Sequence, residues 1–273
     1  MKDENERSTE CDGKGMVERL AEKLLDSEDE REILDGQTRE WIDSLEVLSK
    51  IEIAFGIEEL HAKTILDVGT DCVKPIYIAL KFKPDKIIGI SEDLPEMASD
   101  LEKNSRLFIK ETKIRFHDCN FFDKETLRNI LSEEKIDQFD FILLSKTLHH
   151  LRTGECIAKE RNDKHEHQKD ETEKCCMYGF EEQKIFEELL ELGKRVIVSE
   201  WIIPQEKDDD KVRGRGGYFT ANEMQRIFEN LSGKYKIEFI FPERFHLNKE
   251  ELNKVEPMLR QIDYICFYLE RLA

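Results

Sequence analysis

The stretch TILDVGTDCVKPIYIALKFKPDKIIGI (residues 64–90) decides the fold class. It contains a short apolar strand at 64–69, a turn with one glycine, a helix at 74–82 and a second apolar strand at 86–90. Pro75 lies in the first turn of the helix, where proline is tolerated. A strand, helix and strand in this order predict the repeating unit of a parallel α/β sheet.

The same alternation continues along the chain. Further strands are expected at 113–118, 139–145, 195–201, 236–241 and 263–270, and helices at 95–107, 124–131, 180–192, 221–231 and 248–259. Thr220 and Glu223 form the pattern of a capping box before the fourth of these helices. Apolar strands flanked by helices are buried on both faces. The sequence therefore predicts a Rossmann-like three-layer α/β/α sandwich with a seven-stranded, mostly parallel sheet and an antiparallel last strand.

Three segments lie outside this alternation. Residues 1–15 are polar and acidic, which is typical of a disordered tail. Residues 16–60 carry two helical patterns, at 16–34 and 38–55, and are expected to form an N-terminal helical cap. The main domain is then 61–273, interrupted at 152–178 by a polar insertion after the fourth strand.

Composition narrows the class of protein. The chain has 43 basic and 61 acidic residues, a formal charge of −18, which disfavours broad binding to nucleic acid. No apolar run approaches the length of a membrane span, and the polar start lacks the layout of a signal peptide. Seven scattered cysteines are an odd number and are expected to be reduced thiols. A cytoplasmic protein is expected.

The first strand end is a candidate ligand site, because ligands of open α/β sheets bind beyond the carboxyl ends of the strands. Asp67, Gly69, Thr70 and Asp71 lie at this turn. A pyrophosphate site would need more glycines, and Asp71 would repel a diphosphate. The carboxylates of Asp67 and Asp71 instead favour a cationic ligand such as S-adenosylmethionine. Asp71 is equally well interpreted as a helix N-cap.

The second and third strand ends are also acidic. Glu92, beside Ser91, is placed to bind ribose hydroxyls, and Asp118 to accept a hydrogen bond from an adenine amino group, with the backbone N–H of Cys119 as a second contact. The alternatives are a solvated loop residue at the second strand end and a helix-capping turn at the third.

The fourth strand ends at Ser145, and His149 and His150 follow within about one helical turn. Adjacent histidines point in different directions, so at most one is expected to face a given pocket. A histidine here can act as a general base near neutral pH. The alternative is that the histidines orient the loop or cap a helix.

Four segments, taken in order, resemble the motifs of class I S-adenosylmethionine-dependent methyltransferases: LDVGTD, the acidic tip after IIGI, HDCNFFD and FDFILLSKTLHHL. The resemblance covers about residues 60–201 and extends more loosely to the end of the chain. The resemblance implies the sheet order 3-2-1-4-5-7-6 with strand 7 antiparallel, and S-adenosylmethionine as cofactor. It implies these contacts: the methionine part with Asp67 and Gly69, the ribose with Glu92, the adenine with Asp118 and Cys119, and the methyl face with Ser145.

The chain departs from the family pattern at two strand ends. The family usually has two or three glycines in the first turn, where this chain has one. The GTD form is similar to the turn of some tRNA adenine-N1 methyltransferases. The family's acidic residue two places after the glycine of the second strand is Ser91 here, and Glu92 is displaced by one position.

Two other segments carry candidate chemistry. The insertion contains His165, His167, Cys156 and the adjacent pair 175–176, but it has no C-x-x-C pair, so a charged loop without metal is expected. Arg213 and Arg215, in the glycine-rich stretch KVRGRGGYFT, could clamp an anionic group of a substrate. The alternative for this stretch is a mobile linker.

The sequence thus predicts an S-adenosylmethionine-dependent methyltransferase acting on an unknown acceptor, which could be a small molecule, a protein or RNA. A non-catalytic partner or regulatory subunit of the same fold is one alternative, motivated by the reduced glycine turn. An RNA methyltransferase that contacts tRNA locally through Arg213 and Arg215 is another.

Overall fold

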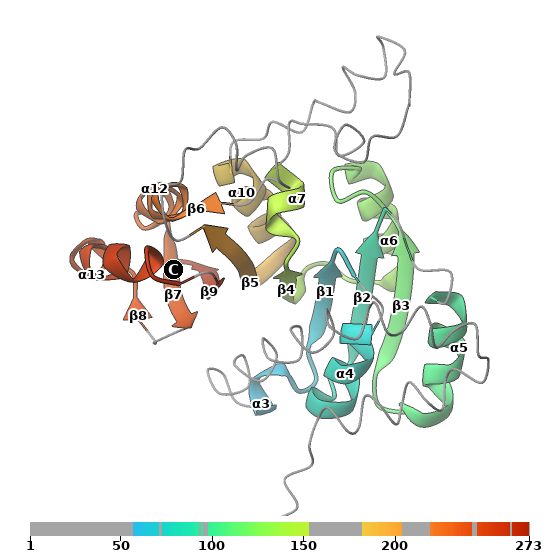
Figure 1. Ribbon diagram of the computed structural model, residues 1–273. Helices are drawn as coiled ribbons and strands as arrows, with labels where there is room; N and C mark the ends of the chain where they lie inside the picture. The colour runs from blue at the N-terminus through green and yellow to red at the C-terminus, as the bar shows by residue number, and fades with distance from the viewer. Residues whose placement is uncertain are drawn as a thin grey trace, which may run out of the picture.

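In the described part of the chain, nine strands form one sheet with the order β3-β2-β1-β4-β5-β9-β7-β8, while β6 pairs with β5 (Figure 1). A computed structural model describes residues 57–70, 73–92, 94, 98–152, 182–203, 219–241, 245–262 and 264–272. The strands are β1 (Thr64–Val68), β2 (Lys86–Ser91), β3 (Lys113–Asp118), β4 (Phe139–Ser145), β5 (Gly193–Ile203), β6 (Phe219–Thr220), β7 (Tyr235–Phe241), β8 (Phe245–His246) and β9 (Tyr264–Arg271).

The strand directions match the predicted sheet. β1 to β5 are parallel neighbours, and β9 lies between β5 and β7 and is antiparallel to both. In the numbering of the seven predicted strands this order is 3-2-1-4-5-7-6, so the expected topology is confirmed. The two additional strands, β6 and β8, have two residues each, which is too short for a hydrophobic period to be read from the sequence.

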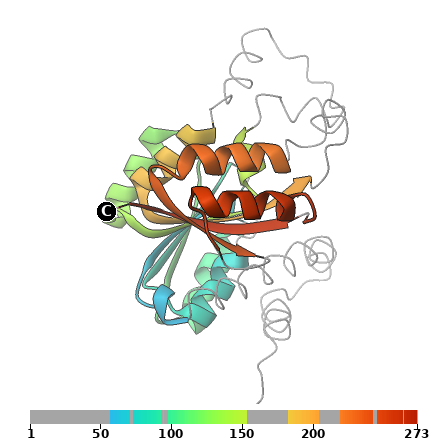
Figure 2. The ribbon, with the colours of Figure 1, turned by 90° about the vertical axis from the view of Figure 1, so that its left-hand side faces the viewer.

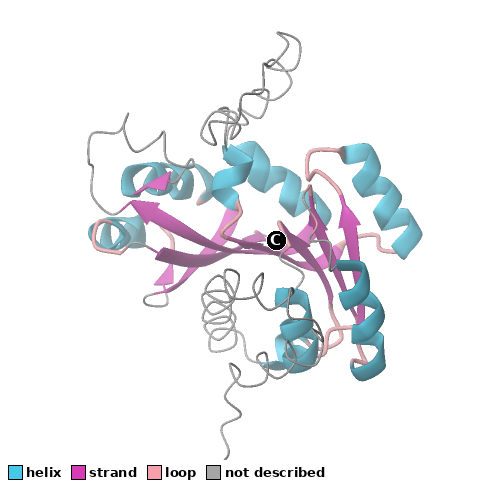
Figure 3. Cartoon of the chain, turned by 45° about the vertical axis from the view of Figure 1, so that its right-hand side comes forward, coloured by secondary structure: helices cyan, strands magenta, loops and turns pink. Residues whose placement is uncertain are grey.

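Helices cover both faces of the sheet, which confirms the three-layer sandwich (Figures 2 and 3). One face is covered by α6 (Lys124–Glu134), α7 (Leu148–Arg152), α10 (Glu182–Leu192), α12 (Ala221–Leu231) and α13 (Lys249–Leu259). The other is covered by α3 (Ile57–Leu60), α4 (Val73–Phe82) and α5 (Ala98–Phe108).

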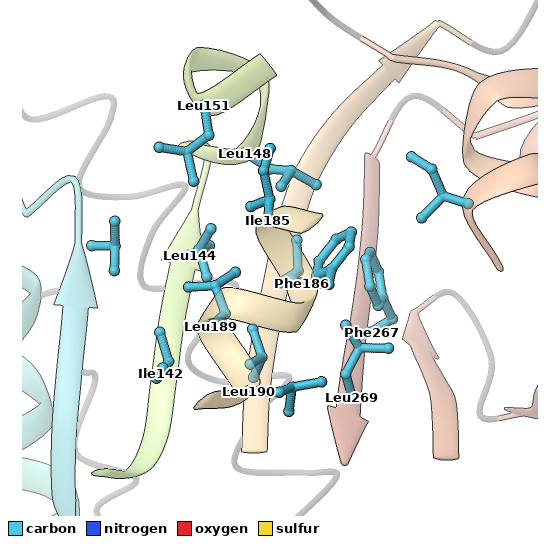
Figure 4. Packing of buried hydrophobic residues seen from close by; sticks show 14 of the residues in the cluster. Ile142, Leu144, Leu148, Leu151, Ile185, Phe186, Leu189, Leu190, Phe267 and Leu269 are labelled. Carbon is cyan, nitrogen blue, oxygen red and sulfur yellow. The ribbon is translucent and has the colours of Figure 1, made fainter. Parts of the chain in front are cut away.

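The larger core lies between the sheet and the helices α6, α10, α12 and α13, and Figure 4 shows part of it around α10. Phe186 and Leu189 of α10 are fully buried, and the Phe186 ring lies 6.2 Å from the ring of Phe267 on β9. Ile142 and Leu144 of β4 belong to this core, while Phe141 and Leu143 belong to the core on the opposite face. Alternate side chains of β4 are therefore buried on both faces, as the apolar run in the sequence predicted.

Helix ends are set by local capping. The box of Thr220 and Glu223 is present at the start of α12, and a second box, of Asn248 and Glu251, opens α13. Helix α6 continues to residue 134 rather than 131 and ends at Lys135, which has φ 54°. A left-handed residue after the last turn is a common way to end a helix.

The tail, residues 16–56 of the helical cap and residues 153–178 of the insertion lie outside the described residues, and Arg152 is the last residue of α7. In the part of the chain that the structure describes, no helix is long and apolar enough to cross a membrane.

Candidate functional site

Backbone hydrogen bonds to the end of β2 hold the turn after β1 in place. Gly69 has φ +69°, a conformation that favours glycine. The N–H groups of Gly69 and Thr70 both donate to the carbonyl of Ile90, at 2.8 and 3.1 Å. A Cβ atom at Gly69 would lie 2.6 Å from Cγ2 of Thr147, which follows β4. The glycine is therefore required for close packing between the β1 and β4 turns.

Asp67 forms a buried ion pair. Lys74 Nζ donates to both carboxylate oxygens of Asp67, at 3.1 and 3.3 Å, and the side chains are 3% and 0% exposed. Lys74 lies in the first turn of α4. The Asp67 carboxylate is thus paired with an ammonium group inside the chain, and its attraction for a cationic ligand stays a prediction. Sequence reasoning did not single out Lys74, although a lysine at the start of the helix after an aspartate turn was a readable signal.

The ends of β2 and β3 lie side by side, with Ser91 paired in register with Asp118. The carboxylates of Glu92 and Asp118 are both exposed to solvent. Asn120 donates a side-chain hydrogen bond to Glu92. The N–H of Cys119 donates to the carbonyl of Ser91 at 3.0 Å. This bond corrects the expectation that the same N–H is available to an adenine ring.

The Cys119 thiol lies among the carboxylates at the ends of β2 and β3. Burial, reinforced by the carboxylates of Asp123, Asp118 and Glu92, raises the pKa of the Cys119 thiol to about 11. The thiol therefore stays protonated at neutral pH and is not a nucleophile. The carboxylates that act on it give the ends of β2 and β3 a negative potential.

The end of β4 meets the end of β5. The Ser199 hydroxyl donates to the Ser145 hydroxyl at 3.2 Å. Lys146 has φ 54° and its N–H donates to the Ser199 carbonyl at 2.8 Å. Its ammonium lies 5.1 Å from the ring centroid of Trp201, and the Trp201 ring packs edge-on against Tyr264 at 5.5 Å. A cation and two aromatic rings thus lie beside the end of β4, a grouping that sequence reasoning missed.

The structure describes the surroundings of one of the two predicted histidines, His149. The ring Nδ1 of His149 lies 2.9 Å from Glu200 Oε1, and its backbone N–H donates to Glu200 Oε2 at 3.0 Å. Glu200, on β5, is fully buried and also accepts from the Trp201 N–H at 2.8 Å. His150 lies in α7, but its side chain is outside the described part of the chain. Glu200 was not predicted.

The structure brings most of the predicted residues to one edge of the sheet. Eight of them lie at the ends of β1 to β4 or directly after these strands, and a ninth, His149, lies in α7, which follows β4. The eight are Asp67, Gly69, Thr70, Ser91, Glu92, Asp118, Cys119 and Ser145. Asp71, Arg213 and Arg215 lie outside the described residues. Within the described ranges, no group of three or more His, Cys, Asp or Glu side chains could hold a metal ion.

The observed strand order and the antiparallel β9 match the sheet that the resemblance to class I methyltransferases implies. The chain has a Rossmann-like α/β/α fold with this strand order. No protein-family model matches the chain, and no curated protein matches it in sequence.

Several solved structures are similar to the chain at low identity. One is a cyclopropane-fatty-acyl-phospholipid synthase-like protein from Lactobacillus casei ATCC 334, with 12% identity, a TM-score of 0.49, and coverage of 94% of this chain and 99% of that one. Another is the plantazolicin methyltransferase BpumL in complex with SAH, with 14% identity, a TM-score of 0.48 and coverage of 96% and 99%. A third is a SAM-dependent methyltransferase from Aquifex aeolicus, with 17% identity, a TM-score of 0.40 and coverage of 94% and 97%.

Proposed function

We propose that this protein binds S-adenosylmethionine at the carboxyl edge of its sheet and transfers the methyl group to an acceptor. The observation that carries the proposal is the pair of solvent-exposed carboxylates, Glu92 and Asp118, at the adjacent ends of β2 and β3. They lie on the same edge as the left-handed turn at Gly69. In open α/β sheets this edge, near the reversal of strand order at β1 and β4, is where ligands bind.

The adenosine part of the cofactor fits these residues. Carboxylates accept hydrogen bonds from hydroxyl and amino groups, so Glu92 suits ribose and Asp118 suits adenine. Asn120 holds the Glu92 side chain in place by a hydrogen bond. The carboxylates of Asp123, Asp118 and Glu92 would repel a pyrophosphate and attract a ligand with a net charge of about +1. These carboxylates favour S-adenosylmethionine over a dinucleotide.

When bound, S-adenosylmethionine supplies an electrophilic methyl carbon on a sulfonium. Direct displacement at such a carbon depends chiefly on alignment of the acceptor. The described residues that would align it lie at the neighbouring ends of two strands: Ser145 and the Lys146 side chain at the end of β4, and the Trp201 side chain on β5.

His149 is the proposed general base for an acceptor that must lose a proton. Its Nδ1 lies 2.9 Å from the Glu200 carboxylate, which orients the ring at the start of α7. His150 stays a candidate, and Arg213 and Arg215 are proposed contacts for an anionic acceptor. Small molecules, proteins and RNA are the classes to screen with labelled cofactor.

Calorimetric titration with S-adenosylmethionine tests the proposal. The wild-type chain is expected to bind, and Glu92→Gln and Asp118→Asn are each expected to weaken binding roughly 10- to 100-fold, because each removes a charge-assisted hydrogen bond. Glu111→Gln is the matched control. Glu111 is also an exposed carboxylate, but it pairs with Lys83 and lies just before the amino end of β3. The absence of binding at millimolar cofactor would overturn the proposal.

A non-catalytic subunit of the same fold is the second candidate. The observation that favours it is that polar groups of the turn after β1 are bonded within the chain. The N–H groups of Gly69 and Thr70 donate to the Ile90 carbonyl, and the Asp67 carboxylate accepts from Lys74. A folded chain that binds neither S-adenosylmethionine nor S-adenosylhomocysteine would support this role.

A further inference from the structure

The backbones of β1 and β4 diverge at their carboxyl ends. The two strands are paired in register up to Val68, the last residue of β1. Beyond this pair, the Gly69 N–H donates to the Ile90 carbonyl of β2, whereas the Lys146 N–H donates to the Ser199 carbonyl of β5. The chain after β1 is thus bonded toward one side of the sheet and the chain after β4 toward the other. Open α/β sheets bind ligands at such a point, where the strand order reverses.

The side chain of Thr147 bridges the two diverging backbones. Its hydroxyl donates a shared hydrogen bond to the Val68 carbonyl at 3.1 Å and to the Ser145 carbonyl at 3.0 Å. Thr147 is 7% exposed, and its methyl group fills the space beside Gly69. One buried hydroxyl therefore links the turn that is expected to contact the methionine part of the cofactor to the strand end that is expected to face the methyl group.

We infer that Thr147 is a positioning residue for methyl transfer, because its hydroxyl sets the separation between the turn at Gly69 and the end of β4. The inference rests on the proposed function and adds to it a buried residue that lies outside the predicted site. Displacement at a methyl carbon depends on alignment, and a misplacement of about 1 Å can cost roughly 100-fold in rate.

The hydroxyl, rather than the methyl group, is expected to have this role. The Val68 and Ser145 carbonyl oxygens both carry partial negative charge and share one donor. Without that donor they repel each other and lose a partner inside the protein, where water does not readily replace it. The ends of β1 and β4 are then expected to move apart, and the turn at Gly69 would move away from Ser145.

The test is calorimetric titration of the full chain with S-adenosylmethionine. Thr147→Val keeps the shape of the side chain but removes the hydroxyl, so binding is expected to weaken roughly tenfold. Thr147→Ser keeps the hydroxyl but removes the methyl group, so its dissociation constant is expected to stay within about threefold of wild type. An equal loss of affinity in the serine and valine variants would show that packing is responsible and would overturn the inference.

Thr64→Val is the matched control, because Thr64 joins the same two strands at their amino ends. Its hydroxyl donates to the Asp140 carboxylate at 3.1 Å and accepts from the Asp140 N–H at 3.2 Å. Both valine variants are expected to lower the midpoint of urea denaturation. Thr64→Val should nevertheless bind S-adenosylmethionine as tightly as wild type, because it loosens the edge of the sheet opposite the proposed site.

Unchanged affinity in Thr147→Val, or an equal loss in Thr147→Val and Thr64→Val, would overturn the inference while leaving the proposed function intact. Failure of the wild-type chain to bind S-adenosylmethionine would instead overturn both. If circular dichroism shows that Thr147→Val does not fold, Thr147→Ser and Thr147→Ala decide, because they differ only by the hydroxyl. The serine variant should then bind roughly tenfold more tightly, and equal affinities would contradict the inference.

Discussion

At the scale of single residues, Gly69 has a structural role that can be separated from ligand binding. Gly69→Ala places a Cβ 2.6 Å from Thr147 and forces an L-residue to hold φ +69°. The left-handed conformation and the overpacking should together lower the free energy of unfolding by about 2–4 kcal/mol. Urea denaturation without any ligand measures this loss.

Gly233→Ala is the matched control for this substitution. A Cβ at Gly233 meets no atom within 4 Å, so its effect on the free energy of unfolding should stay within about 0.5 kcal/mol. Equal losses in the two variants would contradict the explanation by close packing against Thr147.

At the scale of elements, α7 depends on β5. This helix has five residues, which is too short to be stable alone in water. Glu200 on β5 fixes its start through the backbone and the ring of His149, at 3.0 and 2.9 Å. The end of β4 and the start of α7 are thereby held at the edge where the acceptor is proposed to bind.

Glu200→Gln should loosen α7 selectively. The substitution keeps the shape of the side chain but replaces a buried carboxylate that accepts three hydrogen bonds. The free energy of unfolding is therefore expected to fall by about 2–4 kcal/mol. Amide hydrogen exchange of His149 and Leu151 should accelerate more than that of the core strands. Glu238→Gln is the control, because Glu238 is also buried, accepts from Tyr268 and lies on β7. Selective loosening of α7 in both variants would contradict the anchoring role.

At the scale of the whole molecule, a buried carboxylate joins three elements of the sandwich. Glu134, at the end of α6, pairs with Lys113 at the start of β3 (2.5 Å) and with Lys86 at the start of β2 (3.1 Å). Burial acts to raise the pKa of Glu134, but the hydrogen bonds and charges of the two lysines outweigh it and lower the pKa. The carboxylate is therefore more acidic in the folded chain than an ordinary glutamate.

This shift predicts a loss of stability in acid. Because the folded-state pKa of Glu134 lies below the unfolded value of about 4.3, its contribution is fully present above that pH and is lost as pH falls through the folded value. Between pH 7 and pH 3, the free energy of unfolding measured by urea denaturation should decline less in Glu134→Gln than in wild type. Glu111→Gln, which breaks the exposed pair with Lys83, should follow the wild-type curve. If the free energy of unfolding declined equally with pH in all three chains, the proposed coupling between Glu134 ionisation and stability would be contradicted.

The sequence by itself determined the class of the fold and the places where the ligand residues gather. Apolar runs alternating with amphipathic segments specify buried parallel strands, and the box of Thr220 and Glu223 marks a helix start, because both signals act between residues close in the chain. The four strand ends follow from that alternation. The two-residue strands β6 and β8 carry no such period and were missed.

Only the tertiary structure decided what each site residue contacts. Glu200 meets His149 from 51 positions along the chain, Thr147 fills the space beside Gly69, and the Ser91 carbonyl takes the Cys119 N–H. The register between parallel strands places these partners. Even the nearby pair of Asp67 and Lys74 depends on tertiary structure for its burial. Whether a carboxylate faces water or a buried ammonium is set by what packs over it, and that packing is the sum of contacts from the whole chain.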